Sequence, residues 1–179
     1  MKKRKFTKIM VLLLAMVLMF SLPIEAAAAG KVTAGTSFKK AKTVKSGKTV
    51  VTTPKDSGQI VSYLKFKAPA TKTYKITINN LRKYGKKSSQ TIESIFINFN
   101  SLEKDGRINY LKFKQNEKKS YETLWICSQE SWKYGKTKKI KAGTFIPSRT
   151  AGIRLKKGQT IYIVAGNTNY KRCYDLTIK

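Results

Sequence analysis

The sequence predicts an all-β fold, a single antiparallel β-sandwich of the jelly-roll kind. Residues 160–165, Thr-Ile-Tyr-Ile-Val-Ala, form the strongest run of β-branched and aromatic residues after the N-terminal leader. Residues 174–178 alternate in polarity, as a strand with one buried face does. The rest of the domain has no long segment with a 3.6-residue hydrophobic period, which argues against packed helices.

The first 29 residues have the three parts of a signal peptide. Basic residues precede an apolar stretch over residues 9–22, and small residues end the segment at Ala28 and Ala29. An uncleaved membrane anchor is the alternative, but about 14 apolar residues fall short of the ~20 that span a bilayer. We therefore expect cleavage after either alanine and one secreted domain over residues 30–179.

The domain is expected to begin with little regular structure. Residues 30–34 are predicted to be a flexible leader. Thr36 or Ser37 is suited to cap a single helical turn, which would place Phe38 and Ala41 under the first strand.

Three strands follow, separated by residues that favour turns. Pro54 and Gly58 delimit the loop between the first two strands. In the second strand Leu64 and Phe66 share one face, and the third alternates apolar and polar residues, as sandwich strands do. The predicted ranges are 48–53, 60–66 and 74–78.

The second half of the domain combines strands with two lysine-rich segments. Residues 82–87 and 132–139 are predicted to be basic loops. Asp105-Gly106 predicts a hairpin turn, and Pro147 ends a short strand suited to a sheet edge. The predicted strands are 92–99, 108–113, 121–127, 144–146, 153–157, 160–165 and 174–178.

A family resemblance rests on four short segments: Gly35-Thr36-Ser37-Phe38-x-x-Ala41, residues 63–69 with 74–78, residues 157–163, and residues 174–178. They resemble the bacterial pre-peptidase C-terminal domain, an accessory β-sandwich module of secreted bacterial proteins. The resemblance implies a binding or targeting module, often beside a peptidase, and it supplies no catalytic residues. The chain departs from the family at Lys72, where glycine is frequent, and in its basic middle.

The domain is strongly positive, mostly through lysine. The chain has 38 Lys and Arg against 9 Asp and Glu, and without the leader's five basic residues and one glutamate the net charge is +25. Few of these residues are Arg, which is the usual choice for bidentate phosphate or base recognition. Lysines also keep strand exteriors soluble, but this excess is larger than solubility needs and favours attraction to a polyanion.

The sequence gives little support for an enzyme. It contains no His, which removes Ser-His and Cys-His nucleophile activation and the commonest metal ligand. Residues 37–40 match S-x-x-K and residues 135–137 resemble the end of a P-loop, but both lack the companion residues. Glu103 and Asp105, the closest acidic pair, are expected to serve a turn. We therefore predict a non-enzymatic protein without a cofactor or metal.

The tetrapeptide Lys-Tyr-Gly-Lys occurs in both basic loops, at residues 83–86 and 133–136. Lysines interleaved with aromatic rings suit a polyanion or a sugar, because cations meet charge while rings stack on flat faces. Alternatively, two lysine-rich turns share the motif by chance, and their tyrosines pack on neighbouring strands. The candidate anionic-ligand residues are Lys83, Tyr84, Lys86, Lys87, Trp132, Lys133, Tyr134, Lys136, Lys138 and Lys139.

These observations favour a secreted module that adheres to an anionic cell-wall polymer or polysaccharide. Anionic lipid, extracellular DNA bound without sequence specificity, and a secreted enzyme are further candidate partners, and the product would be extracellular or retained at the bacterial surface. Two alternatives stay open: a membrane-active toxin or bacteriocin-like effector, and a small hydrolase whose carboxylate pair the sequence does not reveal.

The two cysteines, Cys127 and Cys173, allow one intramolecular pairing. In an oxidising compartment a disulfide between them would contribute about 4 kcal/mol in the chain-entropy model. Both lie in strand-like runs, so two buried thiols are the alternative. We predict the disulfide.

Overall fold

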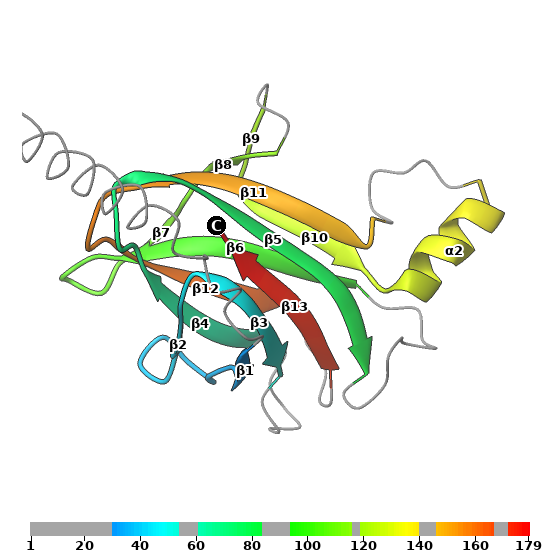
Figure 1. Ribbon diagram of the computed structural model, residues 1–179, viewed down its shortest axis with the longest axis horizontal. Coiled ribbons are helices and arrows are strands. Elements are labelled where there is room, and N and C mark those ends of the chain that lie inside the picture. Colours follow the sequence, from blue (N-terminus) through cyan, green and yellow to red (C-terminus); the bar gives the residue numbers. More distant parts are fainter. Residues whose placement is uncertain (1–29, 54–60, 84–93, 116–118, 140–145, 167–171) are drawn as a thin grey trace, which may run out of the picture.

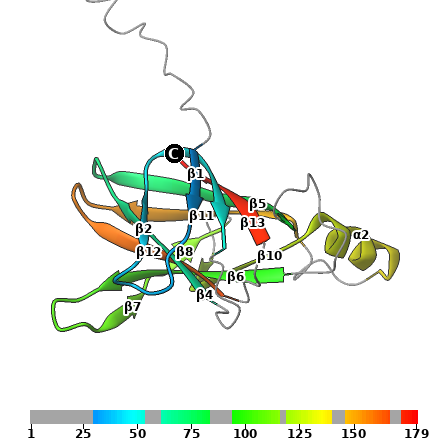
Figure 2. The same cartoon turned by 90° about the horizontal axis from the view of Figure 1, so that it is seen from below.

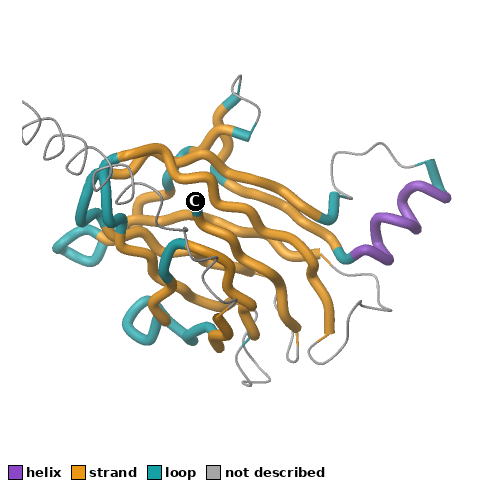
Figure 3. Tube along the Cα trace, viewed as in Figure 1, coloured by secondary structure: helices purple, strands orange, loops and turns teal. Residues whose placement is uncertain are grey.

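The computed structural model describes residues 30–53, 61–83, 94–115, 119–139, 146–166 and 172–179. Figures 1 and 2 show two β-sheets packed face to face, with the helix α2 (Gln129–Thr137) outside one end. Strands make up most of the trace in Figure 3. The predicted all-β sandwich is therefore confirmed.

One sheet has seven strands within the described chain, and we call it the seven-stranded sheet. Its order is β1–β3–β13–β5–β11–β8–β9. The strands are β1 (Gly30–Thr33), β3 (Gly47–Thr52), β13 (Arg172–Ile178), β5 (Lys72–Lys83), β11 (Ser148–Leu155), β8 (Phe113–Lys114) and β9 (Ser120–Tyr121).

The opposite sheet has the order β10–β6–β12–β4–β2, with β7 paired to the remaining part of β6. Its strands are β10 (Thr123–Cys127), β6 (Ser94–Leu102), β12 (Thr160–Gly166), β4 (Val61–Lys67), β2 (Lys42–Val44) and β7 (Ile108–Tyr110).

The apolar faces predicted from the sequence meet between the sheets. Tyr74, Ile76 and Ile78 of β5 are buried on one side, and Leu64 and Phe66 of β4 are buried on the other. The rings of Phe66 and Tyr74 meet edge to face across this core, with centroids 5.1 Å apart. Because apolar and polar residues alternate along each strand, the outer face of each sheet carries polar side chains that a ligand can reach.

Strands β12 and β13 lie inside their sheets. β12 pairs with β4 and β6, and β13 pairs with β3 and β5, so both have neighbours on each side. This confirms the interior position expected for residues 160–165. On the outer face of β13, Asp175 is only 7 % exposed, because polar neighbours surround its carboxylate.

The sheets are mixed rather than purely antiparallel. β1 runs parallel to β3, and β2 runs parallel to β4. The segment predicted as a flexible leader is therefore largely a strand. It is held there because the Thr52 hydroxyl donates to the Val32 carbonyl (3.1 Å), and the Ala34 amide donates to the Thr52 carbonyl (2.9 Å).

The turn after β1 is not a helix in the structure. The Lys40 amide donates to the Ser37 hydroxyl (3.3 Å), and the Ala41 amide to the Phe38 carbonyl (3.3 Å). Phe38 packs against Tyr63 and Tyr162, with ring centroids 5.0 Å from each. These tyrosines lie on the outer face of β4 and β12. Phe38 therefore covers the outer face of the sheet that contains β4 and β12, and does not lie under the first strand as predicted.

Two predicted strands are each divided between the two sheets. The range 108–113 separates into β7, which pairs with β6, and β8, which pairs with β11. The range 121–127 separates in the same way into the end of β9 and strand β10. The Asp105-Gly106 turn between β6 and β7 is confirmed, with Gly106 at φ +85°. Of the short strand at 144–146, only Ile146 is described, and its carbonyl accepts from the Cys127 amide (3.0 Å).

The prediction of a basic loop over residues 132–139 is wrong, because residues 129–137 form the helix α2. Ser128 caps it, since the Ser128 hydroxyl accepts from the Ser131 amide (3.2 Å). Glu130 in the first turn and Lys136 in the last turn complement the helix dipole. The helix buries only Ser131 and Gly135, so it has no apolar stripe for a periodicity search to find.

The predicted disulfide is absent from the structure. Cys127 and Cys173 are free and buried, on strands of different sheets. Burial raises the pKa of the Cys127 thiol to about 11, and it raises the pKa of Cys173 as well. The alternative of two buried thiols is the one that the structure shows.

No helix among the described residues is long and apolar enough to cross a membrane. Residues 1–29, the predicted signal peptide, lie outside the described residues.

Candidate functional site

The structure brings Lys83 and the second basic segment to the same end of the sandwich. β5 ends at Lys83, and Leu81 of this strand forms a parallel bridge with Ser128, the residue that caps α2. In Figure 1 the end of β5 and the start of α2 both lie at the right-hand end of the sheets. Lys83 is exposed, and the candidates Tyr84, Lys86 and Lys87 lie outside the described residues.

The candidates of the second segment lie on α2 and just after it. Lys133, Tyr134, Lys138 and Lys139 are exposed. The Lys136 ammonium lies 3.9 Å from the centroid of the Trp132 ring, one helical turn earlier. One face of Trp132 is thus covered by the chain's own lysine, which leaves less of the ring for a ligand.

A second basic surface, which the sequence did not reveal, lies on the outer face of the seven-stranded sheet. It is a groove of about 990 Å³. We call it the threonine–lysine groove, and its lining residues are Thr73, Lys75, Thr77, Lys114, Gln115, Thr150, Gly152, Thr177 and Lys179.

Strand register places these side chains in rows across the sheet. Thr77 stands opposite Thr150 of β11 on one side and Thr177 of β13 on the other. In the next row, Gly152 stands between Lys75 of β5 and Lys114 of β8. Because Gly152 has no side chain, no side chain of β11 projects between the two lysines in this row.

The lysines of the threonine–lysine groove have no Asp or Glu side chain beside them in its lining. Lys75, Lys114 and Lys179 line it, no acidic residue does, and the ion pairs recorded among the described residues include none of these three lysines. The Thr77 and Thr150 hydroxyls are 2.7 Å apart and are hydrogen-bonded. The lining therefore combines cations with hydroxyl groups that both donate and accept.

Asp175 of β13, two residues before Thr177 of the groove, has its charge balanced by basic side chains. Asp175 accepts from the Arg82 guanidinium (2.8 Å) and from the Asn80 amide (3.1 Å), and the Lys48 ammonium lies 3.7 Å away. This network satisfies Asp175 beside the groove, so its charge does not oppose the binding of an anion there.

A smaller pocket opens where the edges of the two sheets meet. It has a volume of about 370 Å³. We call it the aromatic pocket, and it is lined by Gln115, Tyr121, Thr123, Trp125, Ile146 and Arg149. Gln115 also lines the threonine–lysine groove, so the two are neighbours.

The acidic residues considered for catalysis serve the β6–β7 turn, as expected. Asp105 accepts from the backbone and side chain of Arg107, which lowers the pKa of Asp105, and Glu103 accepts from the Asn109 amide (2.6 Å). Within the described residues, no group of three or more His, Cys, Asp or Glu side chains could hold a metal ion.

The residues of the groove were hidden from sequence reasoning because they come from four strands. Along β5 the signal is the polar half of the alternation, which indicates a solvent-facing surface but no particular function. Only the register of β5, β11, β13 and β8 brings these polar residues together.

Comparison of the sequence with protein-family models gave no match, and comparison with curated proteins gave none either. Function has to be inferred from the chain's own geometry.

Proposed function

We propose that this protein is a secreted, non-enzymatic module that binds an anionic polymer of the cell envelope or its surroundings through the threonine–lysine groove. The observation that carries this proposal is the convergence of Lys75 of β5, Lys114 of β8 and Lys179, which follows β13, with no Asp or Glu side chain in the lining.

The geometry suits a repeating anion better than a single small ion. The lining of the groove comes from β5, β8, β11 and β13 and the residues next to them, so successive phosphates or carboxylates can meet different lysines. Threonine hydroxyls can donate to the same anionic oxygens. Because the groove is built on paired strands, little ordering is required on binding.

The basic residues at the α2 end support the same function from a distance. Lys83, Lys133, Lys138 and Lys139 add positive potential, which raises the rate at which a polyanion meets the protein. The basic segments predicted from the sequence thus act in this proposal as an accessory surface.

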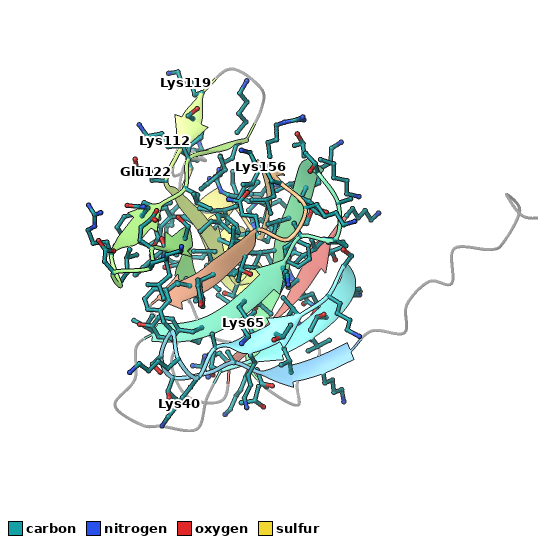
Figure 4. The ribbon with its side chains drawn as sticks, turned by 90° about the vertical axis from the view of Figure 1, so that its left-hand side faces the viewer. Lys40, Lys65, Lys112, Lys119, Glu122 and Lys156 are labelled. Carbon is teal, nitrogen blue, oxygen red and sulfur yellow. The ribbon has the colours of Figure 1, made fainter. Side chains whose placement is uncertain are left out.

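The test compares three variants with equal loss of charge. The groove variant carries Lys75→Gln, Lys114→Gln and Lys179→Gln, and the α2 variant carries Lys133→Gln, Lys138→Gln and Lys139→Gln. The control variant carries Lys39→Gln, Lys40→Gln and Lys42→Gln. All three control lysines are exposed, and Lys40 lies far from the projecting β8–β9 hairpin in Figure 4.

Binding to inorganic polyphosphate and to polygalacturonate is measured between 50 and 200 mM salt. The groove variant should lose the most affinity, and its slope of log K against log salt should fall by roughly 2–3, about one for each lysine that contacts an anion. Equal losses of affinity in all three variants would mean that the protein attracts polyanions through its overall positive charge and has no specific binding site. Leakage of anionic vesicles at the same protein concentrations would favour the membrane-active alternative.

A further inference from the structure

We propose that the aromatic pocket is a subsite for a sugar ring, which makes the anionic polymer a polysaccharide. This inference rests on the proposed function, because it assigns the chemical class of the polymer that the groove binds.

Two exposed aromatic rings form the wall of this pocket. Tyr121 is 41 % exposed and Trp125 is 42 % exposed. Exposing large aromatic rings to water is unfavourable, and clusters of such rings are typical of ligand-binding surfaces. The apolar C–H faces of a pyranose pack on such rings, while its hydroxyl groups stay at the rim.

Both rings are held from behind by a phenylalanine. Trp125 packs against Phe96 of β6 (centroids 5.3 Å apart), and Tyr121 packs near Phe113 of β8 (6.3 Å). Gly166 keeps room for this arrangement, since a Cβ atom there would overlap the Phe96 ring. The orientation of the rings is therefore largely set before a ligand arrives, which lowers the entropic cost of binding.

Polar groups surround the rings in a way that suits sugar hydroxyls and a carboxylate. The Arg149 guanidinium donates to the Gln115 side-chain carbonyl (3.0 Å), which orients both groups at the pocket. The Thr123 hydroxyl accepts from the Asn98 amide (2.9 Å), so its own proton points elsewhere and can be donated. The pocket offers a fixed cation, an amide and a hydroxyl beside a stacking surface.

The pocket and the groove form a continuous surface. Gln115 lines both, so the two adjoin at this residue. The β8–β9 hairpin stands out beside them, and Figure 4 shows Lys112, Lys119 and Glu122 on this projection. A polymer bound along the lysines can place one ring in the pocket without leaving the surface.

A glycan fits this layout better than a single-stranded nucleic acid does. Proteins that bind single strands stack successive bases on aromatic side chains along the groove. The lining of the threonine–lysine groove contains no aromatic residue, and the rings that line the neighbouring aromatic pocket are Tyr121 and Trp125. Bases lying along the groove would have no stacking surface.

The experiment compares two polyanions, of which only one has sugar rings. Polygalacturonate carries one carboxylate on each pyranose, and inorganic polyphosphate carries charge without a ring. Trp125→Ala is expected to weaken polygalacturonate binding about tenfold to a hundredfold, the range for loss of one stacked ring, and to leave polyphosphate binding within about twofold. Tyr121→Ala should act in the same direction, and an unchanged far-UV spectrum shows that each variant folds.

The outcomes separate this inference from the proposed function. If the groove variant loses affinity but Trp125→Ala and Tyr121→Ala affect neither polymer, the sugar subsite is wrong and the polyanion function stands. Equal weakening for both polymers, or tighter binding of an oligothymidylate than of polygalacturonate, also overturns the subsite. If the groove variant binds both polymers as the unaltered protein does, the proposed function itself fails.

Discussion

Asp175 shows how this domain accommodates a buried carboxylate on the outer face of a sheet. Its side chain and that of Arg82 are only 10 % and 13 % exposed, and their atoms approach to 2.8 Å. Asn80, which also donates to Asp175, has a positive φ of 55° beside an irregularity in the β13–β5 register. The bulge thus turns polar side chains toward this carboxylate.

Replacing Asp175 with Asn should destabilise the domain markedly, because it leaves the Arg82 guanidinium nearly buried without a counter-charge. We expect a loss of about 2–4 kcal/mol in the free energy of unfolding, somewhat less than for a fully buried pair since solvent still reaches both groups. Equilibrium urea denaturation measures it.

Asp105→Asn is the matched control. The Asp105–Arg107 pair is exposed, so its loss should change stability far less than loss of the Asp175–Arg82 pair does. If both variants unfold at the same urea concentration, the Asp175 network contributes nothing particular to the fold.

At the scale of elements, the capped helix α2 is the main departure from expectation. Its composition, with Gly135 amid lysines, favoured a loop, and its contacts with the sheet involve small side chains. The signal that was present is the cap: Ser128 precedes a first turn containing Glu130. In a short polar helix, the capping residues are therefore a better sequence signal than an apolar face.

Removing this cap should loosen the helix locally. Ser128→Ala leaves the Ser131 amide without its acceptor, and we expect a cost of about 1 kcal/mol. Hydrogen exchange should accelerate at the Trp132 amide, which bonds to the Ser128 carbonyl (3.1 Å), while exchange in β5 changes little.

Ser120→Ala serves as the comparison, since Ser120 is exposed in β9. An equal effect of the two substitutions on Trp132 exchange would show that the helix does not depend on its cap.

Sequence reasoning was strong for strands whose alternation is long and weak where elements are short. Residues 60–66, 160–165 and 174–178 were placed within a residue or two because burial of one face dictates their pattern. β1 and β2 were missed because edge strands held by few backbone hydrogen bonds need no apolar period.

The candidate site was harder to predict, for a physical reason. The lysine content correctly pointed to a basic surface, but the sequence contains too many lysines to select three of them. Lys75 and Lys114 are 39 positions apart in the sequence. They lie in one row of the sheet only because Gly152 of β11 pairs with both, and this register cannot be read from the sequence. Trp125 was recognised as a strand residue, yet nothing local showed that its ring faces outward.

At the scale of the whole molecule, the position of β1 is compatible with both predicted mature N-termini. β1 begins at Gly30 and pairs with β3 from its first residue. Cleavage after Ala28 or Ala29 would therefore leave the sheet intact. N-terminal sequencing of protein from culture supernatant should find Ala29 or Gly30 first.

A mature chain that starts within β1, at Thr33 or later, would contradict this expectation, because the edge strand would be lost. Recovery of the chain with Met1 in the membrane fraction would favour the uncleaved anchor.

The position of β13 has a consequence for the timing of folding. β13 fills the place between β3 and β5, yet it follows both by about 90 residues or more. During synthesis these two strands emerge long before their shared neighbour, so the seven-stranded sheet cannot close until Ile178 is available. Such distant pairings make folding slow. Late closure of this sheet would suit the export that we propose for this protein, because a chain that has not yet folded can pass through a translocation pore.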